Sequence, residues 1–183
     1  MNLTDNFLIA MPSLADPNFH GTVTYVCAHN EDGAMGIVIN RSLEIELGEV
    51  LAHLGIEVQN GDMRRAPVLQ GGPVQTERGF VIHEPCGTWD SVLQISDAIA
   101  IATSHDILHS MAAGKGPNRA VVALGYAGWG AGQLEREVLD NAWLTTQADS
   151  SIIFDVALDE RWEQAARMLG VDPSRLMGEA GHS

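Results

Sequence analysis

Apolar residues along the chain fall in short runs that are separated by glycine, proline, asparagine and aspartate. The runs at 6–11, 22–29 and 34–40 contain β-branched and aromatic residues, which strands favour. The sequence NEDG at 30–33 is typical of a turn and predicts a hairpin between the last two runs. The run at 120–126 is almost entirely apolar and predicts a central, buried strand. The remaining predicted strands are 67–70, 79–83, 91–96, 98–103 and 151–156.

Helical spacing of apolar residues is found in other segments. Between 46 and 54, leucine and valine recur at intervals of three and four, which predicts a helix with one apolar face. Ser104 and Asp159 are predicted to cap two later helices, which end at Gly114 and Gly170. The predicted helices are 46–54, 105–113, about 133–140 and 160–169. Consecutive strands outnumber strand–helix alternations, so we expect an α+β fold with a mixed, largely antiparallel sheet.

Length and charge narrow the classes of protein that fit. The chain has 183 residues, 45% of them hydrophobic, which suits one globular domain over 1–178 with a disordered tail over 179–183. Its net charge is −14 with only 10 lysines and arginines, so direct binding to nucleic acid is not expected. It has neither an apolar run of the roughly 18 residues that span a membrane nor a secretory signal. We therefore expect a cytoplasmic protein without a membrane partner.

The glycine-rich segment 125–132 follows the predicted central strand and precedes a helix. Such a turn can bind phosphate, but the dinucleotide fingerprint is broken because Gln133 stands where its last glycine should be. Glu135 and Glu137 lie close to the first helical turn and would repel an anion. We therefore interpret the segment as a loop whose glycines make room for aromatic packing by Tyr126, Trp129 and Trp143.

Cys27 and His29 are two residues apart on a predicted strand, so their side chains are expected on the same face. A histidine beside a cysteine can lower the pKa of the thiol and create a nucleophile. The alternative is a small buried cysteine and a histidine that hydrogen-bonds the turn. An enzyme using His83 with a carboxylate is a second catalytic possibility. Cys27 and Cys86 are expected to be reduced thiols in a cytoplasmic protein.

His105 and His109 form the sequence HDILH on a predicted helix, the i, i+4 spacing of zinc-binding histidines. Asp106 replaces the glutamate of the usual motif, and a metal site needs a third protein ligand. The sequence indicates no such ligand. A metal-binding protein is therefore an alternative hypothesis, and exposed helix histidines are the other.

Three separated blocks, at 6–41, 69–83 and 125–144, closely resemble the bacterial YqgE/AlgH family and occur in the order of the family. The resemblance implies one α+β domain with a sheet partly folded on itself and flanked by helices. It also implies a cytosolic protein from a family of mostly unassigned function, called a transcriptional regulator through a link to alginate production. Ala28 and Ser42 depart from the family pattern, which usually has Glu and Pro there. This argues against any mechanism that uses that Glu as a base.

Many residues of the family pattern are polar, and a buried polar group is costly unless it is paired. They are expected either to form an internal hydrogen-bond network or to converge on a binding site, and the two can coexist. The favoured hypothesis is a non-enzymatic binding or regulatory protein with at most an indirect role in transcription. Its partner is a protein or a small molecule, and no cofactor is predicted. The candidate binding residues are His29, Asn30, Asn40, Arg41, Arg78, His83, Tyr126, Trp129, Gln133 and Glu135.

Overall fold

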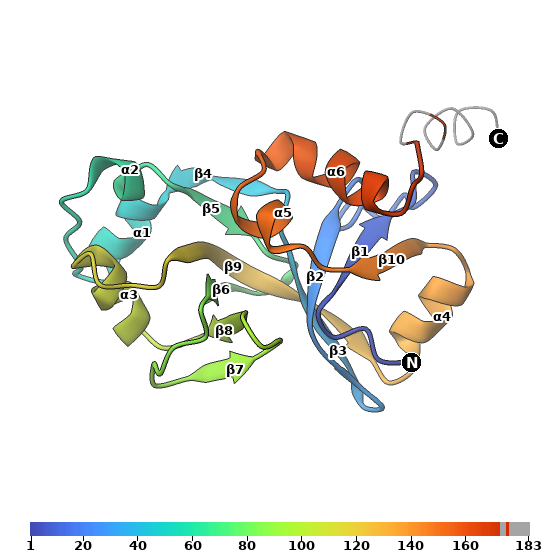
Figure 1. The fold of residues 1–183 in the computed structure, drawn as a ribbon, viewed down its shortest axis with the longest axis horizontal. Helices are drawn as coiled ribbons and strands as arrows, with labels where there is room; N and C mark the ends of the chain where they lie inside the picture. Colours follow the sequence, from blue (N-terminus) through green and yellow to red (C-terminus); the bar gives the residue numbers. More distant parts are fainter. Residues whose placement is uncertain (173–174, 176–183) are drawn as a thin grey trace.

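A computed structural model of the chain describes residues 1–172 and 175. A curled sheet is built around the long strand β9 (Arg119–Gly130), with strands in the order β10-β1-β2-β3-β9-β6-β8-β7 and with β4 and β5 beside this path (Figure 1). The other strands are β1 (Asn6–Ala10), β2 (Val23–Asn30), β3 (Gly33–Val38), β4 (Ser42–Glu46), β5 (Pro67–Gln70), β6 (Val74–Glu84), β7 (Val92–Gln94), β8 (Ala100–Ala102) and β10 (Trp143–Gln147). The helices are α1 (Leu47–His53), α2 (Gly61–Arg64), α3 (Asp106–Ala112), α4 (Gln133–Leu139), α5 (Ser150–Phe154), the 3-10 turn η1 (Leu158–Glu160) and α6 (Arg161–Met168).

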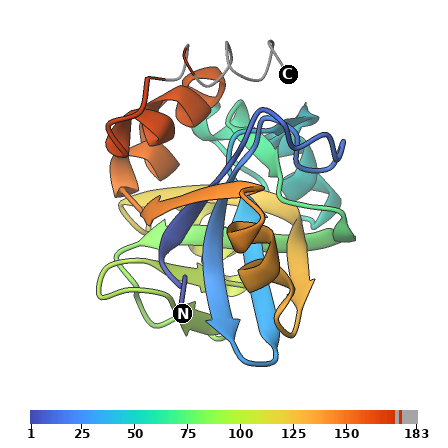
Figure 2. The same ribbon diagram turned by 90° about the vertical axis from the view of Figure 1, so that its right-hand side faces the viewer.

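Strand β9 joins the two halves of the molecule. One edge of β9 pairs antiparallel with β6, while the other pairs first in parallel with β5 and then antiparallel with β3. Figure 1 shows the half with β4–β8 and α1–α3 on one side and the half with β1–β3, β10 and α4 on the other. Figure 2 shows helix α4 lying against the β1–β3 half. The prediction of an α+β fold with a mixed, largely antiparallel sheet is confirmed.

The crossing of β9 from one half to the other depends on close contact between main chains. The amide of Gly71 donates to the carbonyl of Leu124 at 2.9 Å, and the amide of Val38 donates to the carbonyl of Gly71 at 2.8 Å. Gly125 has φ +80, and a Cβ added to it would lie 2.5 Å from the carbonyl oxygen of Gly72. Since real Cβ atoms do not approach an oxygen so closely and rarely adopt this φ, the junction requires glycine.

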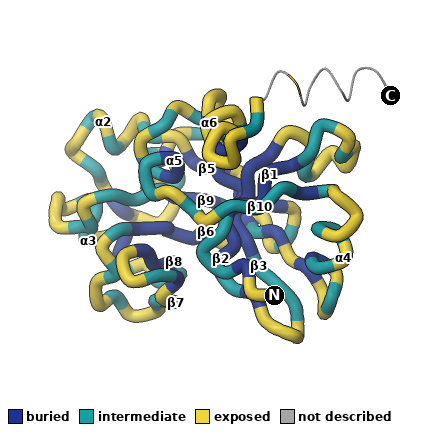
Figure 3. Tube along the Cα trace, turned by 45° about the vertical axis from the view of Figure 1, so that its right-hand side comes forward, coloured by how far each residue is buried: buried dark blue, intermediate teal, exposed yellow. Residues whose placement is uncertain are grey.

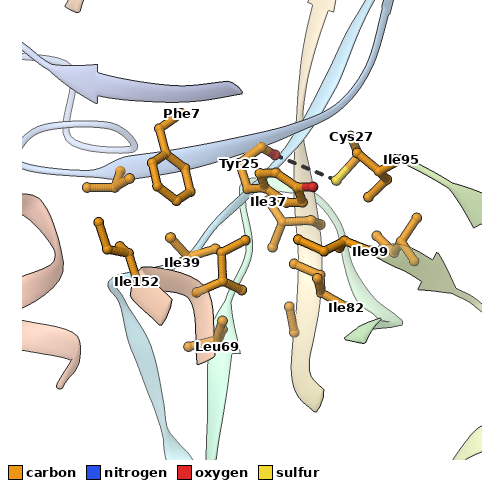
Figure 4. Packing of buried hydrophobic residues seen from close by; sticks show 14 of the residues in the cluster. Phe7, Tyr25, Cys27, Ile37, Ile39, Leu69, Ile82, Ile95, Ile99 and Ile152 are labelled. Atoms are coloured by element: carbon orange, nitrogen blue, oxygen red, sulfur yellow. Dashed lines mark hydrogen bonds between the residues drawn. The ribbon is translucent and has the colours of Figure 1, made fainter. Parts of the chain in front are cut away.

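Three groups of buried apolar side chains hold the layers together. The largest includes Phe7, Tyr25, Ile37 and Ile82 and is drawn in Figure 4. A second lies under α1 and α3, and a third lies under α4 around Trp129. Figure 3 shows that the central strands are buried, whereas the helices are exposed along much of their length. Helices α1, α3, α4, α5 and α6 therefore each bury one side, whereas α2 and η1 bury no residue.

Helix α6 is held to the sheet by a buried arginine at its first residue. Arg161 donates through Nη1 to the carbonyl of Ile39 at 2.7 Å and through Nε to the carbonyl of Val156 at 2.9 Å. Burial lowers the pKa of the guanidinium to about 10, against the opposing effect of the nearby Asp155 charge. Arginine at this position satisfies two carbonyls that a shorter side chain would leave without a partner.

Several predicted elements differ from the structure. Residues 151–156 were expected to be a strand, but α5 occupies this stretch because the Asp149 carboxylate accepts from the amide of Ser151 and begins a helix. Ser104 and Asp159 do not cap the helices that follow them, since α3 and α6 begin after His105 and Glu160 without a side-chain cap. The pattern also missed three short elements, namely β4, α2 and β10.

The glycine-rich segment is also not the loop that we expected. Strand β9 continues to Gly130, because β3 pairs with it from Gly36 opposite Ala127 to Gly33 opposite Gly130. Only residues 131–132 turn before α4 begins. The predicted tail over 179–183 lies outside the described residues. Within residues 1–172 and 175, no helix has the length and apolar character needed to span a membrane.

The junction can be tested with a Gly125→Ala substitution. We expect it to lower the free energy of unfolding by at least about 3 kcal/mol, because it combines an unfavourable φ with overlap against the Gly72 main chain. Gly130→Ala is the matched control, since a Cβ at Gly130 meets only the Gln133 side chain at 3.9 Å. Urea unfolding followed by tryptophan fluorescence measures both. Equal stability of the two variants would contradict the proposed role of the junction.

Candidate functional site

The polar residues around α4 form an internal network. The carboxylate of Glu137 accepts from Trp129 Nε1 at 3.1 Å, from Trp143 Nε1 at 3.0 Å and from Gln133 Nε2 at 2.9 Å. Gln133 in turn accepts from the amide of Gly130 at 3.0 Å. Phe19 stacks on Trp129 and meets Trp143 edge-on. The predicted aromatic packing is therefore present for Trp129 and Trp143, whereas Tyr126 packs against Phe80 in the main core. Glu137, which was not a candidate residue, is the acceptor between the two indoles.

His29 is part of the same structural support. Its Nδ1 accepts from the amide of Leu3 at 2.9 Å, and its Nε2 lies 3.0 Å from Glu135 Oε1. An amide can only donate, so Nδ1 carries no proton, and the imidazole is neutral with its proton on Nε2. The hydrogen bond from His29 lowers the pKa of Glu135. With both ring nitrogens engaged and the side chain only 1% exposed, His29 is not a free base.

Asn40 and Arg41 hold a surface loop in place. Asn40 accepts from the amide of Val23 at 2.8 Å and donates to the carbonyl of Gly21 at 2.9 Å. The Arg41 guanidinium donates to three carbonyls of the loop, those of Pro17, Asn18 and His20. Both side chains therefore satisfy the main chain of residues 17–23 and belong to the scaffold.

His83 is fully buried on β6. Its Nδ1 donates to the carbonyl of Pro85 at 2.9 Å, and its ring lies edge-on to Trp89 with centroids 5.1 Å apart. The remaining ring nitrogen, Nε2, has no hydrogen-bond partner among the described residues. Burial lowers the pKa of His83 despite the bond to Pro85, so the ring is neutral. Among the described residues, no carboxylate forms a hydrogen bond or ion pair with this buried neutral imidazole, which gives no support to the His83 catalytic alternative.

Cys27 and His29 do not share a face, so that prediction is wrong. The register of β2 against β3 shifts between Val26 and Ala28, which makes Cys27 an extra residue in a β-bulge. Cys27 points into the main core, where its thiol donates to the carbonyl of Tyr25 at 3.6 Å (Figure 4). Burial raises the pKa of this thiol far above its ordinary value. The pair cannot act as an activated nucleophile in this arrangement.

Four of the ten candidate residues, Asn30, Arg78, Tyr126 and Trp129, border one open groove of ≈ 890 Å³. The groove runs from the β2–β3 hairpin across β9 and β6 to β7 and β8. Arg78 lies over the Phe80 ring at 5.4 Å and donates to Gln75 at 3.3 Å. Trp129 borders the groove while its indole packs behind the sheet with Phe19 and Trp143. Of the two roles expected for the family's polar residues, the internal network accounts for His29, Asn40, Arg41, Gln133 and Glu135. Only a small group of candidates borders the groove.

The sequence reasoning missed the groove residues that leave it open. Gly128 is an exposed residue in β9, and a Cβ added there would meet only Tyr126 at 3.6 Å and Val74 at 4.0 Å. Neither its φ nor a neighbouring main chain requires glycine. Across the groove, Leu93 of β7 is 48% exposed. To recognise Gly128 as a groove residue, one must know which glycines are required by a positive φ or by a close main chain, and the sequence does not give this information.

His105 and His109 lie at the start and in the last turn of α3. Among residues 1–172 and 175, no group of three or more His, Cys, Asp or Glu side chains could hold a metal ion. Asp106 is engaged in the local structure, where it accepts from Ser104 and from the amides of Asp90 and Ile107. The metal-binding alternative therefore lacks a third ligand in the part of the chain that the structure describes.

Comparison with known proteins identifies the family. A family model described as AlgH-like matches residues 7–174. The chain belongs to the AlgH-like family. A UPF0301 protein of Thioalkalivibrio sulfidiphilus is 56% identical and covers 100% of the chain and 97% of its own length. One from Nitrosococcus oceani is 52% identical, covering 98% of the chain and 96% of its own length.

Solved structures agree with this membership. The solution structure of the AlgH protein from Pseudomonas aeruginosa has a TM-score of 0.82 and 49% identity, covering 100% of this AlgH-like chain and 97% of its own. A crystal structure of a Corynebacterium diphtheriae protein has a TM-score of 0.71 at 17% identity, over 94% of this chain and 88% of its own. The second likeness concerns the fold alone.

The network around α4 predicts a large effect of Glu137→Ala in this AlgH-like chain. Removing the carboxylate leaves two indole N–H groups without their acceptor, so we expect a loss of about 2 kcal/mol in the free energy of unfolding. Glu163→Ala removes only an exposed i, i+4 contact with Arg167 and should cost less than about 0.5 kcal/mol. Urea unfolding of both variants tests the prediction, which fails if their losses are similar.

The environment of the two cysteines predicts their reactivity. In the native AlgH-like protein, iodoacetamide at pH 8 should modify the partly exposed Cys86 and leave the buried Cys27 unmodified. After denaturation both should react, as measured by mass spectrometry of proteolytic peptides. Modification of native Cys27 as fast as Cys86 would show that the thiol is accessible and would revive the thiol hypothesis.

Proposed function

We propose that this AlgH-like chain is a non-enzymatic binding protein of the cytosol, with at most an indirect role in transcription. The groove between the β2–β3 hairpin and β7 receives an extended segment of a partner protein. The observation that carries the proposal is the open floor at Gly128. A glycine in a strand interior weakens the strand, and it often marks a place where a ligand or another main chain approaches closely.

Two features of the groove suit a polypeptide. Its sides offer apolar contacts from Val74, Phe80, Leu93 and Tyr126, and Asn30 and Asp32 border the same groove with polar groups. Such a mixture of apolar floor and sparse polar groups is typical of binding sites. The exposed Gly128 leaves its strand surface uncovered by a side chain, so a partner main chain can approach β9 closely.

Other functions receive less support from the same residues. Cys27 is buried with a raised thiol pKa, and both ring nitrogens of His29 are hydrogen-bonded. An enzyme that uses the Cys27 thiol as its nucleophile would therefore have no activated thiolate there. Direct binding of DNA is disfavoured by the net charge of −14, because phosphate contacts require clustered lysine and arginine. A transcriptional effect of this protein would therefore pass through its protein partner.

The proposal can be tested by photo-crosslinking in cells. A photoreactive amino acid at Leu93 should give a discrete crosslinked species, because this exposed side chain borders the groove. Adding Gly128→Val should reduce that species at least about tenfold by filling the floor. Gly130→Val is the matched control, because Gly130 also lies exposed on β9 but does not border the groove.

The position of the probe provides a second control. The same amino acid at Leu139, which is 74% exposed on α4, should not give this species. If Gly128→Val and Gly130→Val leave the Leu93 crosslink equally strong, or if no Leu93 crosslink forms, the groove is not the binding site.

A further inference from the structure

A second, more enclosed cavity lies on the other side of the exposed segment of β6. It has a volume of ≈ 780 Å³ and is bordered by α1, β6, β8, the start of α3 and β9. Seven of its seventeen lining residues belong to the apolar cluster under α1 and α3. The apolar lining residues include Ile45, Val50, Leu54, Leu108, Val122 and Leu124. Leu54 is 41% exposed here, so apolar surface remains in contact with solvent at the cavity.

The two cavities are separated by a bulge in β6. Val74 pairs with Tyr126 and Gly79 pairs with Leu124. The chain therefore advances five residues along β6 while it advances only two along β9, and the extra residues form the bulge. The intervening residues 75–78 are exposed. One of them, Arg78, borders both cavities. The second cavity thus shares three border residues with the groove, Arg78, Phe80 and Thr103, of which Arg78 is the cation.

Basic side chains gather at this cavity although the protein is strongly acidic. Arg78, His53 and His105 border it, together with one carboxylate, Glu77. The chain contains 24 acidic residues against 10 lysines and arginines, whereas one arginine and one carboxylate border this cavity, so the excess of negative charge is absent here. No carboxylate among the described residues lies within ion-pair distance of Arg78, whose polar contact is the neutral Gln75.

A glycine keeps this cavity open as well. Gly79 is exposed, and a Cβ there would meet only Leu124 Cδ2 at 3.8 Å, an ordinary contact inside the cavity. Neither its φ nor a nearby main chain requires glycine. A larger residue at this strand position would improve β propensity but occupy the cavity.

We propose that this second cavity binds a small molecule with an apolar chain and one carboxylate. The chain lies among the leucine and valine side chains, and the carboxylate pairs with the Arg78 guanidinium at the mouth. Arginine suits this role because its planar donors match a carboxylate and its charge persists at all physiological pH values. The cavity volume falls within the range of small-molecule sites.

Octanoate and 1-octanol are a matched pair of probes, since they share the apolar chain and differ in the charged group. Titration followed by amide shifts in ¹H–¹⁵N spectra should place octanoate at Ala102, Leu108 and Leu124, with at least tenfold weaker binding of octanol. Arg78→Gln should weaken octanoate binding about tenfold and leave octanol unchanged. Arg65→Gln, a loss of one exposed arginine charge elsewhere on the protein, should have little effect.

Two glycine variants separate this proposal from the one for the groove. Gly79→Val should abolish octanoate binding, whereas Gly128→Val should leave it intact, and thermal unfolding confirms that both variants are folded. The proposal is overturned if octanol binds as tightly as octanoate, or if Gly79→Val, or the milder Gly79→Ala where valine prevents folding, binds octanoate normally. If Gly128→Val loses the Leu93 crosslink but binds octanoate normally, the groove and the second cavity are independent sites.

Discussion

The contact between the Gly71–Gly72 main chain and Gly125 is the constraint on which the remaining architecture depends. It lets β9 pass from β5 to β3 along one edge while β6 follows the other. Side chains at these positions would push the main chains apart and separate the two halves of the sheet. The register of β6 then places its bulge at the middle of the molecule, and the two cavities lie on either side of it.

The polar residues of this chain divide into two groups by their hydrogen bonds. Glu137, His29 and Arg41 direct their polar atoms at the main chain or at neighbouring side chains of the same protein. These contacts hold α4, the N-terminus and the 16–22 loop against the sheet. They also satisfy polar groups in partly buried positions, which would otherwise be destabilising. Arg78 and Asn30 also make a local hydrogen bond each, with Gln75 and with the amide of Asp32, but they differ in bordering open space. The scaffold and the proposed binding surfaces therefore use different members of one set of polar residues.

The glycines divide in a comparable way. Gly71 and Gly125 are required because another main chain occupies the space of a side chain. Gly79 and Gly128 have ordinary φ values and free space where a Cβ would lie, and both border cavities. A glycine of the second kind reduces strand propensity without any benefit to the fold. The binding that we propose at the two cavities provides a reason for these residues.

Local signals in the sequence determined the fold class, the β2–β3 hairpin, the central position of β9 and the helices α1, α3 and α4. Hydrophobic periodicity and turn residues report on contacts within a few positions, and those contacts suffice for such elements. They failed at residues 150–154, where two adjacent isoleucines suit a strand or a helix and the Asp149 cap decided for a helix. They also failed at 127–130, where pairing with β3 keeps a glycine-rich segment extended.

The site depended on the tertiary structure to a greater degree. Simple alternation placed Cys27 beside His29, but pairing with β3 introduced the bulge that separates them. Likewise, the sequence offered ten candidate binding residues and left open whether they form an internal network or a site, and only the folded chain revealed which of them border a groove. The identity of a residue limits which bonds it can make, whereas its partners come from segments distant in sequence. His29 and Glu135 are 106 positions apart, and no local pattern could have paired them.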